Sequence, residues 1–340
     1  MVSIQSIRTL FETRKRYRIV YRNYLSVMLG VYEQKGRIRV VCRDGYTGFV
    51  NFQTAVALVK AFIKSSNTLK PSEAMNLIKR VADQGGESLI TSSPILCLEL
   101  ATEYQTNEQL AKIIKMHESE EFFFGGKLIK LHGMLKNGDY LGVFVKEEYK
   151  FLEPENEVVI DVGANIGDSA IYFILRGARK VIALEPYPHS YFDAKRNLQE
   201  NGFQDRIVLL NAGYGMKVEI SVEDNKFSNG SSDLIDSRNK GISIKLYTLQ
   251  NLLDNFSLDS AVLKMDCEGC EYNLLNESSN VLRKFKRILI EYHYGYKKLK
   301  NKLEQSGFSV RCSEPINFYE SYKVANKYVS IGYIWAIRED

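Results

Sequence analysis

The chain has 340 residues, of which 45% are hydrophobic and 26% are charged, and its formal net charge is +5 at pH 7. These proportions are ordinary for a globular protein, and the length favours two domains over one core. The charge excess is too small to indicate a nucleic-acid partner by itself. No apolar run approaches the roughly 20 residues that cross a bilayer, and the charged N-terminus does not resemble a signal peptide, so we expect a cytoplasmic protein.

The first third of the chain has mostly helical patterns and carries no chemical motif that we can identify. Apolar residues recur at three- and four-residue steps over 4–29, which predicts an amphipathic helix, and further helices are predicted over 51–64, 72–82 and 106–118. Residues 1–121 are therefore interpreted as a mostly helical accessory domain. Basic residues alternate with tyrosines in the first of these helices, namely Arg14, Lys15, Arg16, Arg18 and Arg22. Such a stretch can grip RNA, but we favour the solvated face of a helix.

From residue 122 onward, short apolar strands alternate with helical segments. This alternation favours an α/β domain over 122–340 with a parallel, doubly wound, Rossmann-like sheet. The last strand returns after a long loop and suits an antiparallel edge strand. Strands are expected over 128–131, 140–145, 158–162, 180–185, 206–211, 261–265, 287–292, 308–312 and 331–337, with a turn at Asn137–Gly138 and a hairpin of 216–222 with 242–247.

A strand followed by a glycine-spaced turn lies midway along the chain. Val158–Val162 is apolar except for Asp161, as is typical of a buried parallel strand. Gly163 and Gly167 then let the chain turn tightly and let a ligand approach the backbone. Because ligands of doubly wound sheets bind beyond the carboxyl ends of the strands, we expect this turn to hold a nucleoside cofactor.

The charges around the turn distinguish between two cofactors. The next strand ends in Glu185, whose carboxylate could accept hydrogen bonds from both hydroxyls of a ribose, as NAD or S-adenosylmethionine would offer. The turn is one glycine short of the NAD pattern, and Asp161 and Asp168 flank it, where they would repel a pyrophosphate. A sulfonium ligand with an ammonium group would instead be attracted by these carboxylates, which favours S-adenosylmethionine.

A second cluster of polar residues ends the strand 261–265. Asp266, Glu268 and Glu271 crowd three carboxylates around Gly269, an arrangement that requires cations, donors or raised pKa values. Lys264 lies two residues before Asp266 and should share its face of the strand. An alternative is that Glu268 and Glu271 only complement a helix N-terminus.

The strand 287–292 ends beside this cluster in Glu291 and His293. We interpret His293 and Glu268 as candidate general bases, with Asp266 and Lys264 holding the acceptor or its base, although His293 could equally be structural. Asp266, Glu291 and His293 could together bind a metal, but we predict none. Cys267 and Cys270 form a C-x-x-C without a second pair, so packed thiols are favoured over zinc.

Residues 140–293 resemble the FkbM family of S-adenosylmethionine-dependent methyltransferases. The resemblance rests on the motifs Val159–Asp168, Leu184–Pro186 and Leu263–Glu271, with the segment Gly142–Tyr149 as the lead-in; the Asp-x-Glu-Gly-x-Glu element of the third motif is the most specific. It covers about the last 220 residues and leaves the first 120 unplaced. It implies a seven-stranded methyltransferase sheet and O-methylation of a sugar or other small-molecule hydroxyl.

The resemblance also implies which residues hold the cofactor. By position, four residues would line the methionine end of S-adenosylmethionine, Glu185 would bind the ribose, and Asn211 would lie near the adenine. The four residues at the methionine end are Asp161, Gly163, Asn165 and Gly167.

The leading hypothesis is methyl transfer to a hydroxyl of a small molecule such as a sugar or glycan unit. An RNA acceptor held by the basic N-terminal stretch is one alternative, and nucleic acid is therefore the less favoured partner. A non-catalytic binding protein of the same fold is another. An NAD-dependent enzyme is the least favoured reading, because of the charges around the turn.

Overall fold

The computed structural model describes residues 13–339 except 53, 57, 60–69, 87–88, 91–93, 105, 118, 134–138, 223–241 and 323–324. It separates into two compact units. The first comprises Met1–Ser119, Lys136–Gly138 and Phe318–Lys327, and the second comprises Glu120–Leu135, Asp139–Asn317 and Tyr328–Asp340. Within the described ranges, no helix combines the length and apolar character that crossing a membrane requires.

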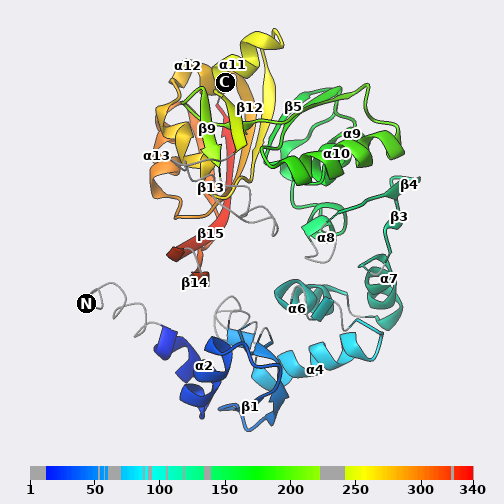
Figure 1. The fold of residues 1–340 in the computed structure, drawn as a ribbon, viewed down its shortest axis with the longest axis vertical. Coiled ribbons are helices and arrows are strands. Elements are labelled where there is room, and N and C mark those ends of the chain that lie inside the picture. Colours follow the sequence, from blue (N-terminus) through cyan, green and yellow to red (C-terminus); the bar gives the residue numbers. More distant parts are fainter. Residues whose placement is uncertain are drawn as a thin grey trace. The chain divides into compact units, whose positions relative to one another are not determined.

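Over the described residues from 13 to 119, the first unit is mostly helical and contains one small hairpin (Figure 1). The hairpin turns at Asp44–Gly45, a residue pair that favours tight turns between strands. The helix α4 begins at Pro71, and the Glu73 carboxylate accepts a hydrogen bond from the Lys70 backbone N–H at 2.9 Å. The elements are a helix over 13–20, α2 (Tyr24–Tyr32), β1 (Ile38–Val41), β2 (Thr47–Val50), α4 (Pro71–Ala82), α6 (Pro94–Glu103) and α7 (Asn107–His117).

The basic N-terminal stretch forms two helices where one was expected. The first helix covers 13–20 and stops before Tyr21, which makes an isolated β-bridge with Cys42. The next helix, α2, starts only at Tyr24. Tyr17 and Tyr21 are 7% and 0% exposed and pack against each other. These two rings are therefore core residues and cannot stack on nucleic-acid bases. The part of the expected helix before residue 13, part of the one expected over 51–64, and the expected turn at Asn137–Gly138 lie outside the described residues.

The second unit is built on one seven-strand path with the order β13-β15-β12-β11-β5-β6-β7. All neighbours from β12 through β7 are parallel, and β15 is antiparallel to both of its neighbours. This is the expected doubly wound α/β sheet. The strands are β5 (Val158–Val162), β6 (Lys180–Leu184), β7 (Ile207–Leu210), β11 (Ala261–Met265), β12 (Phe285–Tyr292), β13 (Phe308–Cys312) and β15 (Ala325–Arg338).

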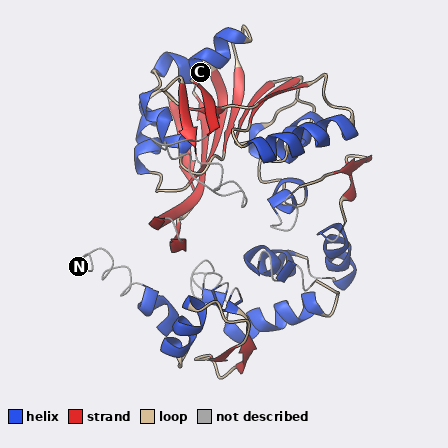
Figure 2. Ribbon diagram, in the orientation of Figure 1, coloured by secondary structure: helices blue, strands red, loops and turns tan. Residues whose placement is uncertain are grey.

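Helices lie on both faces of this sheet (Figure 2). Every residue of β5 and β11 is buried, which explains why both strands read as continuous apolar runs. The helices are α9 (Asp168–Leu175), α10 (Pro188–Asn201), α11 (Leu249–Asn255), α12 (Ser279–Leu282) and α13 (Lys297–Gln305). A smaller sheet has the order β8-β10-β9, from Gly213–Tyr214, Ile242–Tyr247 and Glu219–Val222, and includes the expected antiparallel hairpin.

Two expectations about strands are wrong. β15 is antiparallel as expected, but it lies between β12 and β13 and is not an edge strand. Residues 140–145 do not form a strand, because α8 (Asp139–Phe144) is a helix there. The partner of β4 (Lys127–Lys130) is instead β3 (Glu121–Phe124), just before it in the chain. β14 (Ile316–Tyr322) pairs with β15.

Candidate functional site

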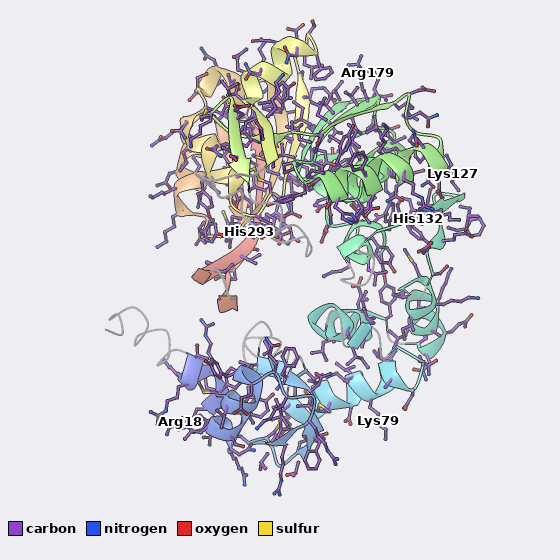
Figure 3. The ribbon with its side chains drawn as sticks, viewed as in Figure 1. Arg18, Lys79, Lys127, His132, Arg179 and His293 are labelled. Carbon is purple, nitrogen blue, oxygen red and sulfur yellow. A yellow bond between two sulfur atoms is a disulfide. The ribbon has the colours of Figure 1, made fainter. Side chains whose placement is uncertain are left out.

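The loops that follow four neighbouring strands meet at one edge of the sheet. Val162 is the register partner of both Leu184 and Met265, so β5, β6 and β11 end at the same level. β12 ends at Tyr292, directly before His293, which is 3% exposed (Figure 3). The parallel topology therefore gathers both predicted clusters, which are about 100 residues apart in the sequence, at one edge.

The glycine turn has a backbone that few residues could adopt. Gly163 and Gly167 have φ values of +80° and +83°, and Asn165 has φ +46°. A Cβ atom on Gly163 would lie 1.8 Å from the Asp266 carbonyl oxygen. Gly163 thus admits the backbone of the loop after β11, where the sequence had suggested only the close approach of a ligand.

Asp161 and Lys264 form an ion pair beneath this turn. They are register partners on β5 and β11, with Nζ 3.1 Å from the carboxylate, and both are almost completely buried. Lys264 also donates a 2.6 Å hydrogen bond to the Gly163 carbonyl, and Ser169 donates one of 2.6 Å to Asp161. Burial by itself lowers the pKa of Lys264, but Asp161 and Asp266 outweigh that effect and raise it, so the ammonium stays charged. Lys264 therefore faces Asp161 and the glycine turn, whereas the sequence had suggested a position beside the acceptor.

The carboxylate of Glu185 links the glycine turn to the segment that follows β6. Its carboxylate accepts hydrogen bonds from the backbone N–H groups of Asn165 (2.8 Å) and Tyr187 (2.9 Å). The side chain is buried, and that burial raises its pKa from 4.5 to about 8. Each carboxylate oxygen has a second lone pair, so the group can still accept hydrogen bonds from a ligand.

A single pocket connects these groups. Among the predicted cofactor residues, Gly163, Asn165 and Glu185 line it, and among the predicted catalytic residues, Asp266 and Glu268 line it. Asp161, Gly167, Asn211 and Lys264 do not belong to the lining. The full lining is Val162, Gly163, Asn165, Leu184, Glu185, Pro186, Tyr187, Ser190, Gly213, Tyr214, Asp266, Cys267, Glu268 and Cys270.

Asn211 supports the pocket wall from outside. Its side-chain amide donates to the backbone carbonyls of Glu185 at 3.0 Å and of Pro186 at 3.1 Å. These contacts fix the segment after β6, which carries Glu185 into the pocket.

His293 lies between two carboxylates. Its Nδ1 is 3.1 Å from Glu271 and its Nε2 is 3.3 Å from Glu268. Glu271 is fully buried and also accepts hydrogen bonds from the backbone N–H groups of His293 and Gly269. Burial by itself lowers the pKa of His293, but the hydrogen bonds with Glu268 and Glu271 outweigh it and raise the pKa to about 12. The imidazole is therefore protonated in this arrangement, and Glu268, with 37% of its side chain exposed, is the member that reaches the pocket.

Asp266, Glu291 and His293 also converge. Each offers one ligand atom, and the three atoms lie within 4.8 Å of one another, so this is where the described residues could hold a metal ion. Tyr149 donates to Asp266 at 3.4 Å, and Tyr333, the register partner of Glu291 on β15, donates to Glu148 at 3.3 Å. Burial, reinforced by the charge of Asp266, raises the pKa of Glu291 well above its usual range.

Sequence reasoning missed part of the site. Tyr333 reaches it because β15 inserts beside β12, a long-range pairing that no local pattern signals. Cys267 and Cys270 form a disulfide, so the expectation of packed free thiols was wrong; the C-x-x-C spacing was the available signal. The disulfide encloses Glu268, whose φ of +55° lies in the left-handed region.

Residues 161–310 match the family model of the methyltransferase FkbM domain. These residues are thus identified as an FkbM methyltransferase domain, and the resemblance drawn from the motifs is confirmed. No curated protein sequence matches the chain.

The chain is also similar to solved structures, including the following three. Precorrin 8W decarboxylase of Methanobacterium thermoautotrophicum is 19% identical, over 57% of this chain and 88% of its own, with a TM-score of 0.34. Precorrin-6y C5,15-methyltransferase of Geobacter metallireducens is 15% identical, over 57% and 87%, with a TM-score of 0.31. Magnesium protoporphyrin IX methyltransferase of Synechocystis with bound SAM is 13% identical, over 60% and 82%, with a TM-score of 0.34. None of them bears on the substrate of this chain.

Proposed function

We propose that the protein transfers the methyl group of S-adenosylmethionine to a hydroxyl of a small molecule such as a sugar or glycan unit. The observation that carries the proposal is the pocket whose lining includes Glu185 and the glycine turn together with Asp266 and Glu268. A donor and an acceptor bound in one pocket react as if in a unimolecular step.

In the proposed cofactor site, Gly163 and Asn165 contact the methionine end and Glu185 accepts hydrogen bonds from the ribose hydroxyls. Asp161 and Gly167 shape the turn from behind, and Asn211 holds the wall on the adenine side. Ribose hydroxyls that donate to Glu185 would favour its ionised form and so lower the pKa that burial raises.

In the proposed transfer, the acceptor oxygen attacks the sulfonium methyl group, a carbon–oxygen bond forms, and the carbon–sulfur bond breaks to release S-adenosylhomocysteine. The oxygen gains positive charge as it attacks, so its proton becomes acidic and a carboxylate is a sufficient base. Glu268 takes this proton, because it is the exposed member of its pair with the protonated His293. His293, anchored by Glu271, orients Glu268.

Two further residues complete the proposed machinery. Asp266 lines the pocket and would accept a hydrogen bond from the acceptor. Lys264 holds the Gly163 carbonyl and Asp161, so we assign it to positioning the cofactor turn. Residues 1–121 are proposed to form an accessory domain, and the burial of Tyr17 and Tyr21 removes part of the basis for an RNA-binding stretch there.

The test uses the full chain with isotope-labelled S-adenosylmethionine and fractionated cell extract, followed by identification of the labelled product. The proposal expects label in a small molecule, as an O-methyl group. Label confined to RNA would favour an RNA methyltransferase. Failure of calorimetry to detect S-adenosylmethionine binding would favour a non-catalytic binding protein.

A further inference from the structure

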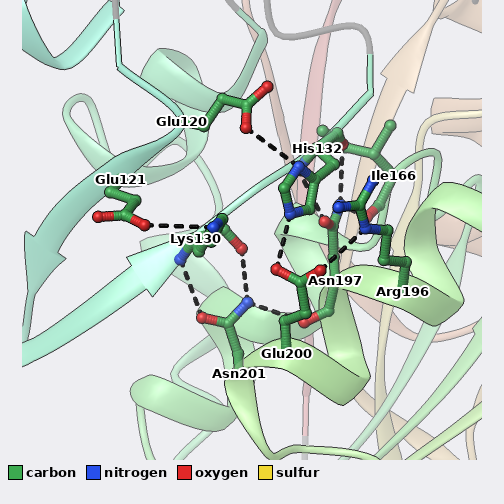
Figure 4. Close-up of polar contacts among 9 residues, drawn as sticks. All are labelled: Glu120, Glu121, Lys130, His132, Ile166, Arg196, Asn197, Glu200 and Asn201. Atoms are coloured by element: carbon green, nitrogen blue, oxygen red, sulfur yellow. Dashed lines mark hydrogen bonds and ion pairs between the residues drawn. The ribbon is translucent and has the colours of Figure 1, made fainter.

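The segment that contains β3 and β4 is fastened to α10 by side-chain contacts with its main chain (Figure 4). Asn201 accepts a hydrogen bond from the Lys130 N–H at 3.0 Å and donates to the Lys130 carbonyl at 2.6 Å. Likewise, Asn197 accepts a hydrogen bond from the His132 N–H at 2.7 Å and donates one to the His132 carbonyl at 3.0 Å. Asparagines four apart on a helix share one face, and residues two apart on an extended chain share one side, so the two pairs repeat the same contact.

The imidazole of His132 fixes the end of this segment. It is 7% exposed, and its Nδ1 lies 3.1 Å from Glu120 while its Nε2 lies 2.7 Å from Glu200 on α10. The same stretch of chain is therefore bound to α10 both by its main chain and by a side chain.

Only one of the two asparagines also contacts the glycine turn. The Asn197 amide donates a second hydrogen bond, of 2.9 Å, to the carbonyl oxygen of Ile166, and Asn197 is completely buried. Ile166 lies between Asn165, whose N–H is bound by Glu185, and Gly167, and all three are part of the turn. A Cβ atom on Gly133 would lie 2.9 Å from the Ile166 side chain, so the segment after His132 also backs the turn directly.

We infer that Asn197 is a positioning residue for the cofactor, through which the β3–β4 segment holds the glycine turn in its binding conformation. Asn165 has a left-handed backbone, which asparagine tolerates better than most residues but which is still held here by contacts on two sides. Glu185 supplies them from the pocket side and Asn197 from the opposite side. The inference rests on the proposed cofactor, and no motif of the sequence indicates it.

The experiment compares Asn197→Ala with Asn201→Ala, a matched control that loses the same kind of main-chain contact without the one to Ile166. We expect Asn197→Ala to weaken S-adenosylmethionine binding about tenfold by calorimetry and Asn201→Ala to change it by less than about twofold. Thermal unfolding temperatures should fall in both variants. In turnover assays, Asn197→Ala should raise the KM for the cofactor and leave kcat unchanged, because Asn197 does not touch the reacting groups.

Equal Kd values for the two variants would overturn the inference. If Asn197→Ala does not fold, Asn197→Ser, which keeps one donor, takes its place with the same expectations. Should the wild-type protein itself not bind S-adenosylmethionine, the proposed function fails, and the amide NMR signals of Asn165 and Gly167 decide the inference alone. They should shift in the Asn197 variant and stay in place in Asn201→Ala, and unshifted signals in both would refute the role of Asn197.

Discussion

The α-carbon of Gly163 faces the carbonyl oxygen of Asp266 so closely that an added Cβ atom would lie 1.8 Å from it. The turn after β5 and the loop after β11 are therefore in backbone contact, and this contact joins the proposed cofactor end of the pocket to its acceptor end.

We expect Gly163→Ala to separate these loops, to lower the free energy of unfolding by more than about 3 kcal/mol, and to abolish cofactor binding. Gly202→Ala is the control, because Gly202 also has a positive φ but has open space around it. It should cost only about 1–2 kcal/mol, through backbone strain alone, and leave the Kd unchanged. Denaturant unfolding and calorimetry measure both effects, and equal losses in the two variants would contradict the steric argument.

Glu185→Gln should weaken S-adenosylmethionine binding about 10- to 100-fold, because an amide nitrogen would face a backbone N–H and the carboxylate would no longer accept from the ribose. Asp44→Asn is a matched control in the first unit, since Asp44 also accepts hydrogen bonds from two backbone N–H groups. That variant should bind the cofactor like the wild-type protein. Wild-type affinity in Glu185→Gln would remove Glu185 from the cofactor site.

The stability of the ligand-free protein should depend on pH through Glu185. Burial raises its pKa from 4.5 to about 8 in the folded protein, so its contribution is fully present below pH 4.5 and is lost as the pH rises through 8. The free energy of unfolding should therefore fall by a few kcal/mol, on the order set by this shift, relative to Glu185→Gln between about pH 5 and pH 9. Parallel pH profiles of the two proteins would show that Glu185 is already ionised.

Glu268→Gln should lower kcat about 10²- to 10⁴-fold with little change in the Kd for S-adenosylmethionine, because it removes the proposed base. His293→Ala should also lower kcat while cofactor binding persists, since Glu268 loses the group that orients it. Glu304→Gln, an exposed carboxylate next to Lys300, serves as the control and should be fully active. Full activity in His293→Ala would contradict the assignment of Glu268 as the base and His293 as the residue that orients it.

Chelators should leave the methyl transfer rate unchanged. Asp266, Glu291 and His293 converge within 4.8 Å, but both imidazole nitrogens of His293 already face glutamates, Glu268 and Glu271. The check is activity after dialysis against EDTA, with and without added Mg²⁺ or Mn²⁺. If dialysis abolishes activity and either ion restores it, these three residues would be assigned as a metal site.

The parts of the structure that follow from local patterns were predictable. The buried runs of β5, β6 and β11 and the turn at Gly163 identified the sheet and its binding edge. Residues 140–145 are too short an apolar run for its periodicity to distinguish a strand from a helix, and they form α8.

Long-range pairing was beyond local patterns. Lys264 was expected to share a face with Asp266, and the charge of Asp266 does act on it, but its ion pair with the register partner Asp161 could not be read from the local pattern. The insertion of β15, which places Tyr333 opposite Glu291 in the sheet, depends on strands that are distant in the sequence.

The position of β15 also sets where the catalytic part of this chain can end. The family match stops at residue 310, inside β13, but β13 reaches the rest of the sheet only through β15. A chain shortened to residue 310 would leave β12 as an unpaired edge, with Glu291 and His293 at its end and a row of open backbone groups ready to pair with another molecule. The last residues, although outside the matched domain, thus pair with the lateral edge of β12 and keep it closed to other chains.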